Sequence, residues 1–192
     1  MRRFTALFVS LLAFGAAAVA QIEPKPLEAP KTEFYLGYAY QRADTSGSTV
    51  LNDVDLKAGF AFEFSRYLKN HNFGLTVDLA RDSNSRVNST GIKYSRASYM
   101  VGPTYRFHNI GFFTANVHAL AGIDHDIFTV PETNTTLTYT STAAAAAVGA
   151  ALDGNLSRHI GIRVAQVDYL YTNHYSTNQG SFRYTGGVVI RF

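Results

Sequence analysis

The 192-residue sequence contains no cysteine, and only 16% of its residues are charged. The lack of cysteine excludes disulfides, thiolate chemistry and cysteine-ligated metal sites, so burial and hydrogen bonding must stabilise the fold. The low charge content is unusual for a fold whose whole surface faces water. Lysine and arginine form no cluster that could follow a phosphate backbone, so nucleic acid is not an expected partner.

After the first twenty residues, the sequence also has no apolar run close to the roughly 20 residues that a transmembrane helix needs. Within those twenty, Arg2 and Arg3 precede an apolar stretch over 4–14, and residues 18–20 (Ala-Val-Ala) match a small-x-small cleavage site. This order predicts a secretory signal peptide over 1–20 rather than a retained anchor, because the apolar stretch is too short to span a bilayer. Without it, 15 basic residues oppose 14 acidic ones, and no transmembrane helix is expected.

From residue 32 onward, apolar and polar residues alternate with a period of two. The proline-rich stretch over 21–31 is expected to be an extended periplasmic tether. In the clearest strand, Phe60, Phe62 and Phe64 share one face. Its twelve residues exceed the usual five or six and suit the roughly 9–11 of a membrane-crossing strand. The expected strands cover 32–43, 54–65, 73–82, 93–107, 111–126, 140–153, 160–174 and 182–192.

Two of these strands have irregular patterns. The alanine run Ala143–Ala147 prefers a helix by intrinsic propensity, but we expect a strand because an odd strand number would break the up-and-down order. Small residues there would leave room for a bulky neighbour inside the barrel. In the seventh strand the polar residue Arg163 has an odd number, whereas Gln166 and Asp168 have even numbers, so the polar face changes side within the strand. This change predicts a β-bulge.

The connections between the strands alternate in length. Long outer loops and short periplasmic turns are typical of outer-membrane barrels. The longer connections, rich in serine, threonine, asparagine and glycine, cover 44–51, 82–92, 129–139 and 175–181. The shorter ones cover 66–72, 108–110 and 154–159.

Strand length, low charge content and mid-strand charges of both signs favour a barrel whose apolar side faces lipid. We therefore predict an all-β fold, an eight-stranded antiparallel up-and-down transmembrane β-barrel over 32–192. Charges enclosed in its lumen need partners, and an eight-stranded barrel is only wide enough for its own side chains. The expected lumen network consists of Asp55, Lys57, Glu63, Asp78, Arg96, Arg106, Arg163, Asp168 and Arg183.

The chain ends in alternating apolar residues and a terminal aromatic, formed by Tyr184, Val188, Ile190 and Phe192. This ending resembles the C-terminal assembly signal of outer-membrane barrels. Together with the signal peptide and the strand layout, it makes the sequence resemble the OmpA/OmpX-like outer-membrane barrel superfamily. The resemblance implies export to the bacterial outer membrane, recognition by the barrel assembly machinery, and contact with lipid and lipopolysaccharide. We expect a monomer without cofactors.

One local motif, His174-Tyr175-Ser176, is similar to the nucleophile region of PagL-type lipid A deacylases. A histidine near Ser176 could accept its proton, and a carboxylate should orient that histidine. No acidic residue follows Ser176, and Asp168 lies about 20 Å from His174 along an extended strand. The sequence therefore does not assemble a complete catalytic set.

A second motif, Asp124-His125-Asp126, suggests a metal site. In a strand the two carboxylates share one face while His125 points to the other. This splits the ligands, so we expect no metal site there.

Three functions remain open after these arguments. The favoured one is a non-enzymatic barrel with a structural or surface-interaction role through its extracellular loops. The alternatives are a lipid A-modifying barrel enzyme and a narrow pore for small ions.

Overall fold

The computed structural model contains eight β-strands and describes residues 30–43, 54–68, 72–87, 91–107, 111–131, 135–174 and 177–192, without the side chains of 85–87. The strands are β1 (Thr32–Ala43), β2 (Val54–Tyr67), β3 (Phe73–Val87), β4 (Ile92–Arg106), β5 (Phe113–Pro131), β6 (Thr136–Asn155), β7 (Ile160–His174) and β8 (Thr177–Arg191). Across these ranges no helix has the length and apolar character needed to cross a bilayer. The expected signal peptide and all but the end of the tether lie outside the described residues.

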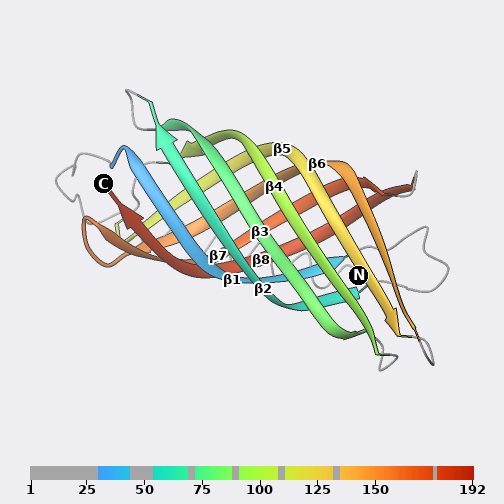
Figure 1. The fold of residues 1–192 in the computed structure, drawn as a ribbon. Helices are drawn as coiled ribbons and strands as arrows, with labels where there is room; N and C mark the ends of the chain where they lie inside the picture. The colour runs from blue at the N-terminus through green and yellow to red at the C-terminus, as the bar shows by residue number, and fades with distance from the viewer. Residues whose placement is uncertain are drawn as a thin grey trace, which may run out of the picture.

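Each strand pairs with its sequence neighbours, and β1 pairs with β8 to close a barrel (Figure 1). All eight pairings are antiparallel, so the predicted fold class is confirmed. At the closure, the Phe192 amide donates to the Thr32 carbonyl, and the amides of Lys31 and Thr32 donate to the Phe192 carbonyl. Both ends of the barrel chain thus meet at one rim, here named the terminal end. The opposite rim is the distal end.

The outside of the barrel is apolar and the inside is polar. Phe60 is 54% exposed, whereas Glu63, three residues along the same strand, is 3% exposed. Near the seam, the Phe34 ring lies 5.0 Å from the Phe64 ring and 6.0 Å from the Phe192 ring. The apolar faces of the strands therefore point outward, as predicted for a barrel that meets lipid.

Apolar packing inside the barrel is confined to small clusters. One of them lies at the distal end of β1, β2 and β4 and consists of Ala43, Val54, Leu56, Ile92 and Tyr94. The Tyr94 ring in this cluster stacks on Phe128 at 4.2 Å. Most of the remaining interior is filled by charged and amide side chains.

An irregularity in the β1–β2 pairing changes which residues of β2 face the lumen. The register shifts just after Ala39, and beyond the shift Leu56 is buried. An extra residue in one strand inverts the inward and outward phase. Asp55 and Lys57, which were expected in the lumen, therefore lie on the outer face, where the Tyr40 hydroxyl donates to Asp55 at 2.8 Å.

The two irregular strands follow the sequence-based expectations. The β7–β8 register shifts between Arg163 and Gln166, which confirms the predicted bulge. Val164 and Ala165 both face outward at the shift. β6 is a strand over its whole length, including Ala143–Ala147, because pairing with β5 and β7 outweighs the helix preference of alanine.

The strands extend further toward the distal end than the sequence predicted. β3 continues to Val87 and β5 to Pro131, well into the stretches 82–92 and 129–139 that were expected to be loops. β5 has 19 residues and β6 has 20, about twice the roughly 9–11 that cross a membrane. The β5–β6 pair therefore reaches further at the distal end than β1 and β2 (Figure 1).

Candidate functional site

The lumen contains buried charges from all eight strands. The described residues contribute eight carboxylates and five guanidiniums that are buried there. The carboxylates are Glu33, Glu63, Asp78, Asp82, Asp124, Asp126, Asp153 and Asp168, and the guanidiniums are Arg96, Arg106, Arg163, Arg183 and Arg191. Seven members of the predicted network thus lie inside the barrel, while Asp55 and Lys57 do not.

Arg183 on β8 joins opposite walls of the barrel. Its two terminal nitrogens donate to both carboxylate oxygens of Asp78 on β3, each at 2.9 Å. Its Nε donates to Asp168 on β7 at 3.0 Å. Paired N–H groups on a carboxylate form the strongest class of protein hydrogen bond. Arg183 therefore links three strands across the lumen.

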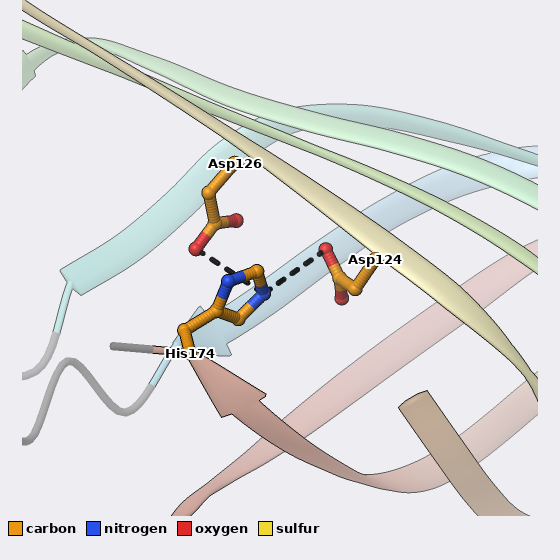
Figure 2. A group of neighbouring side chains, drawn as sticks. All are labelled: Asp124, Asp126 and His174. Carbon is orange, nitrogen blue, oxygen red and sulfur yellow. Dashed lines mark ion pairs between the residues drawn. The ribbon is translucent and has the colours of Figure 1, made fainter. Parts of the chain in front are cut away.

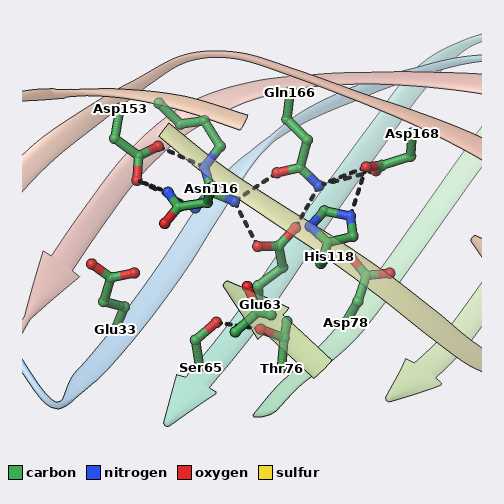
Figure 3. Close-up of polar contacts among 12 residues, drawn as sticks. Glu33, Glu63, Ser65, Thr76, Asp78, Asn116, His118, Asp153, Gln166 and Asp168 are labelled. Carbon is green, nitrogen blue, oxygen red and sulfur yellow. Dashed lines mark hydrogen bonds and ion pairs between the residues drawn. The ribbon is translucent and has the colours of Figure 1, made fainter. Parts of the chain in front are cut away.

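Arg163 on β7 organises the neighbouring layer. It donates to Glu63 at 2.6 Å and to Asp153 at 2.8 Å, and its guanidinium lies 4.3 Å above the Tyr35 ring. Gln166 then links Glu63 at 2.6 Å to Asp168 at 3.0 Å (Figure 3). The layers of Arg163 and Arg183 thus form one continuous network.

At the terminal end the network continues to Glu33, because Arg191 donates to both Asp153 and Glu33. The Glu33 carboxylate accepts from Arg191 at 2.7 Å and from the Tyr67 hydroxyl at 3.0 Å. Arg106 lies 3.4 Å from Glu33 and 3.5 Å above the Tyr67 ring. Strands β1, β2, β4 and β8 are held together at this rim.

A glycine on β6 makes room for part of the network. His118 Nε2 lies 2.9 Å from Asp168 Oδ1, and a Cβ at Gly149 would overlap this Asp168 oxygen and crowd the imidazole. The sequence predicted that small residues in this strand would accommodate a bulky neighbour, and Gly149 is one of them.

The distal part of the lumen contains a second cluster, built around Arg96 on β4. Arg96 donates to both oxygens of Asp126, at 2.7 and 3.0 Å, and the Tyr94 hydroxyl donates to the same carboxylate at 2.9 Å. The strand register pairs Arg96 with Asp82 on one side and Asp126 on the other. Asp124 lies 3.6 Å from Arg96 Nε.

His174 at the distal end of β7 points into this cluster (Figure 2). Its Nε2 faces Asp126 Oδ2 at 3.6 Å and Asp124 Oδ1 at 3.9 Å. His125 faces away and contacts the Thr142 hydroxyl at 2.7 Å, as its place in the strand predicted. A histidine from another strand, His174 on β7, takes the place beside the two carboxylates that His125 does not, with one ligand atom of each residue within 4.8 Å of the others.

The predicted hydrolase motif has a different environment from the one expected. Ser176 lies outside the described residues. Asp168 pairs with Arg183 rather than with His174, while His174 contacts the Ser141 hydroxyl at 3.0 Å through Nδ1. His174 is fully buried on the lumen side of its strand, away from the lipid-facing surface.

Several carboxylates of the lumen were absent from the predicted network. Asp124 and Asp126 are in phase with the buried His118 on β5, and Glu33 is in phase with the buried Tyr35 on β1. Alternation within each strand was the signal that could have identified them. The contact of Asp126 with His174 had no sequence signal, because it depends on the register of β5 and β7 on the two sides of β6.

The outer face carries basic side chains on four neighbouring strands, three near the distal ends of their strands and Arg81 in the middle of β3, opposite Phe60. Arg42 on β1, Lys57 on β2, Arg81 on β3 and Lys93 on β4 are all exposed. They follow outward-facing apolar and aromatic residues such as Phe60. This outer basic row is distinct from the charges in the lumen.

Comparison with known proteins identifies the family of this chain and solved structures that share its fold. The model of the outer membrane protein beta-barrel domain family matches residues 5–192. None of the curated protein sequences compared with the chain matches it significantly.

Solved structures show the same architecture at low sequence identity. Ail, the attachment invasion locus protein of Yersinia pestis, is 18% identical, with a TM-score of 0.61 over 84% of this chain and 99% of that one. Neisserial surface protein A is 16% identical, with a TM-score of 0.61 over 86% and 100% of the two chains. OprG of Pseudomonas aeruginosa is 11% identical, with a TM-score of 0.52 over 85% and 96%.

Proposed function

Because the chain belongs to the outer membrane protein beta-barrel domain family, we propose that it is a non-enzymatic bacterial outer-membrane barrel whose role is surface interaction. The terminal end faces the periplasm and the distal end faces the cell exterior, the usual orientation of such barrels. The partner we propose is the phosphate-bearing part of lipopolysaccharide.

The outer basic row of Arg42, Lys57, Arg81 and Lys93 is the observation that carries this proposal. Arg81 pairs with Phe60, the last outward-facing aromatic residue of β2, and the other three side chains lie further toward the distal end. This is the level at which we expect lipid headgroups to meet the protein. Arginine and lysine bind phosphate through charge-assisted hydrogen bonds, and each basic residue near an anionic lipid surface contributes about 1 kcal/mol.

A shallow hollow on the outer face adds a place for such a headgroup. It has a volume of about 420 Å³ and combines a guanidinium with aromatic and small residues. Its lining consists of Tyr38, Ala58, Gly59, Phe60, Arg81 and Ser83. Such a surface fits a molecule with a phosphate at one end and acyl chains at the other.

One structural neighbour has been solved with a polyanion. Ail of Yersinia pestis has been solved in complex with the heparin analogue sucrose octasulfate. In the present chain the row of four basic residues would supply the complementary charge.

The lumen supports the two alternative functions less well. A pore needs a continuous path, but Arg183 and Arg163 bridge the interior between strands on opposite sides. A lipid A-modifying enzyme needs its reactive groups on the lipid-facing surface, but His174 faces the lumen.

Titration of the refolded barrel with lipopolysaccharide micelles in a neutral detergent tests the proposal. We expect Lys57→Gln and Arg81→Gln each to weaken binding several-fold and to reduce its salt dependence, because each removes a phosphate partner. Arg66→Gln is the matched control, since Arg66 is exposed on β2 near the terminal end. Equal affinities for all three variants and the wild type would contradict the proposal.

Two further measurements address the alternatives directly. A steady single-channel conductance of the refolded barrel in planar bilayers would favour a pore. Loss of a lipid A modification in cells carrying Ser176→Ala, measured by mass spectrometry, would favour an enzyme.

A further inference from the structure

We propose that Asp124, Asp126 and His174 form a binding site for one divalent transition-metal ion of the Zn²⁺ class at the distal end of the lumen. The site is independent of the outer basic row and of the proposed lipopolysaccharide binding. Two of its residues come from β5 and the third from β7, on either side of β6.

The three ligand atoms have the spacing that a single small cation can bridge. They lie within 4.8 Å of one another, with His174 Nε2 at 3.6 Å from Asp126 and 3.9 Å from Asp124 (Figure 2). In a tetrahedral zinc site with bonds of about 2.0–2.2 Å, neighbouring ligand atoms are roughly 3.3 Å apart. Side-chain rotations would have to bring the three atoms closer together, and a water molecule would take the fourth position of a tetrahedral shell.

Asp124 is the member whose surroundings most require a cation. Its side chain is fully buried, and neither carboxylate oxygen has a hydrogen-bond donor among the described residues. Its contact with Arg96 Nε, at 3.6 Å, is too long for a hydrogen bond. Burying a carboxylate without donors is costly, and a metal ion at this position would remove that cost.

His174 is oriented as a metal ligand by its other ring nitrogen. Nδ1 contacts the Ser141 hydroxyl at 3.0 Å, and this contact directs Nε2 toward the two carboxylates. A second partner on the far nitrogen is the usual arrangement for a metal-bound histidine. A proton on Nε2 would be too far from either carboxylate for a good hydrogen bond, whereas a cation between them would contact all three groups.

The balance of charge also favours a cation at this end. Asp82, Asp124 and Asp126 are buried near the distal end, and Arg96 is the guanidinium that the strand register places among them. The remaining five buried carboxylates lie with four guanidiniums and His118. With its carboxylates ionised, the described distal cluster carries more negative than positive charge, and a divalent ion would offset this excess.

The donor set selects the class of metal. One imidazole nitrogen with carboxylate oxygens suits Zn²⁺, Co²⁺ or Ni²⁺, whereas Ca²⁺ and Mg²⁺ prefer shells made of oxygen alone. Arg96 and Tyr94 hold the Asp126 carboxylate by hydrogen bonds and so act as positioning residues.

Metal titration of the refolded wild-type barrel, first treated with a chelator, tests the site. We expect one equivalent of Zn²⁺ to bind by calorimetry, Co²⁺ to give a visible absorption band, and millimolar Ca²⁺ or Mg²⁺ not to compete. His174→Asn and Asp124→Asn should each lower Zn²⁺ affinity at least tenfold. His125→Asn is the matched control, because His125 lies between the two aspartates but faces outward, and it should bind as the wild type does.

X-ray absorption of the Zn²⁺-loaded wild type provides a test that needs no variant to fold. One imidazole with oxygen ligands is expected, and two or more imidazoles would overturn the assignment. The proposal also fails if the wild type binds no Zn²⁺ at millimolar concentration, or if folded His174→Asn and Asp124→Asn bind it unchanged. A folded, closed barrel migrates differently on a gel before and after boiling, so gel migration of unboiled samples shows which variants are folded.

Discussion

At the scale of single residues, the lumen depends on a few arginines that each satisfy more than one carboxylate. Arg183 is fully buried and binds Asp78 and Asp168 on two different strands. A buried ion pair adds little net stability compared with apolar packing, but removing one partner leaves an uncompensated charge. Replacing such a buried arginine is therefore expected to lower the free energy of unfolding far more than replacing an arginine on the surface.

Arg183→Met is expected to lower the free energy of unfolding by about 3–5 kcal/mol, because two buried carboxylates lose their shared partner. Urea titration of the refolded barrel, followed by tyrosine fluorescence or gel migration, measures this loss. Arg81→Met is the control on the outer face and should change the free energy of unfolding by less than about 1 kcal/mol. Similar losses for both variants would contradict the network described for the lumen.

The residue-level contacts were only partly predictable from the sequence. Side-chain direction alternates along a strand, so charged residues on the face opposite the apolar one were predicted to point into the lumen. This identified Glu63, Asp78 and Arg183 as lumen residues. Their partners were not predictable: Arg183 and Asp78 are 105 residues apart and meet only when β8 closes on β1. The cluster of His174 with Asp124 was missed because it depends on the register that brings β5 and β7 together across β6.

At the scale of single strands, local alternation predicted most boundaries and both faces of the sheet. It failed on β2, where the register shift after Ala39 moves Asp55 and Lys57 to the outer face. A bulge exchanges the inward-facing and outward-facing positions of a strand. Apolar and polar residues keep alternating through the bulge in β2, so the sequence pattern does not reveal the exchange. The distal connections were predicted too long because serine- and threonine-rich segments there continue as paired strands.

β6 offers a direct test of the two faces through neighbouring alanines. Ala147 is buried against Met100, Leu120 and Leu170, whereas Ala146 faces outward. Ala147→Leu should cost about 1–3 kcal/mol through overpacking of the lumen. Ala146→Leu should leave the free energy of unfolding unchanged or raise it, because the larger side chain extends into lipid. The same urea titration, performed in vesicles, measures both, and a larger loss for Ala146→Leu would invert the assigned faces.

At the scale of the whole molecule, closure of the β1–β8 seam makes the two ends of the barrel chain interdependent. The backbone of Phe192 pairs with that of Thr32, while the Phe192 ring lies exposed against Phe34. The seam bonds involve only the backbone, so the terminal aromatic ring is not needed to form them. This separates the stability of the finished barrel from the proposed role of Tyr184, Val188, Ile190 and Phe192 as an assembly signal.

Phe192→Ala should therefore lower the stability of the refolded barrel by only about 1 kcal/mol, the usual contribution of an exposed aromatic contact. In cells, the same substitution should sharply reduce the amount of folded protein in the outer membrane, measured by unboiled gel migration of membrane fractions. Phe113→Ala is the matched control, because Phe113 is an exposed aromatic residue near the same terminal end but far from the C-terminus in sequence. If both variants accumulate equally in the outer membrane, the terminal ring does not act as an assembly signal, and backbone closure of the seam would suffice for insertion.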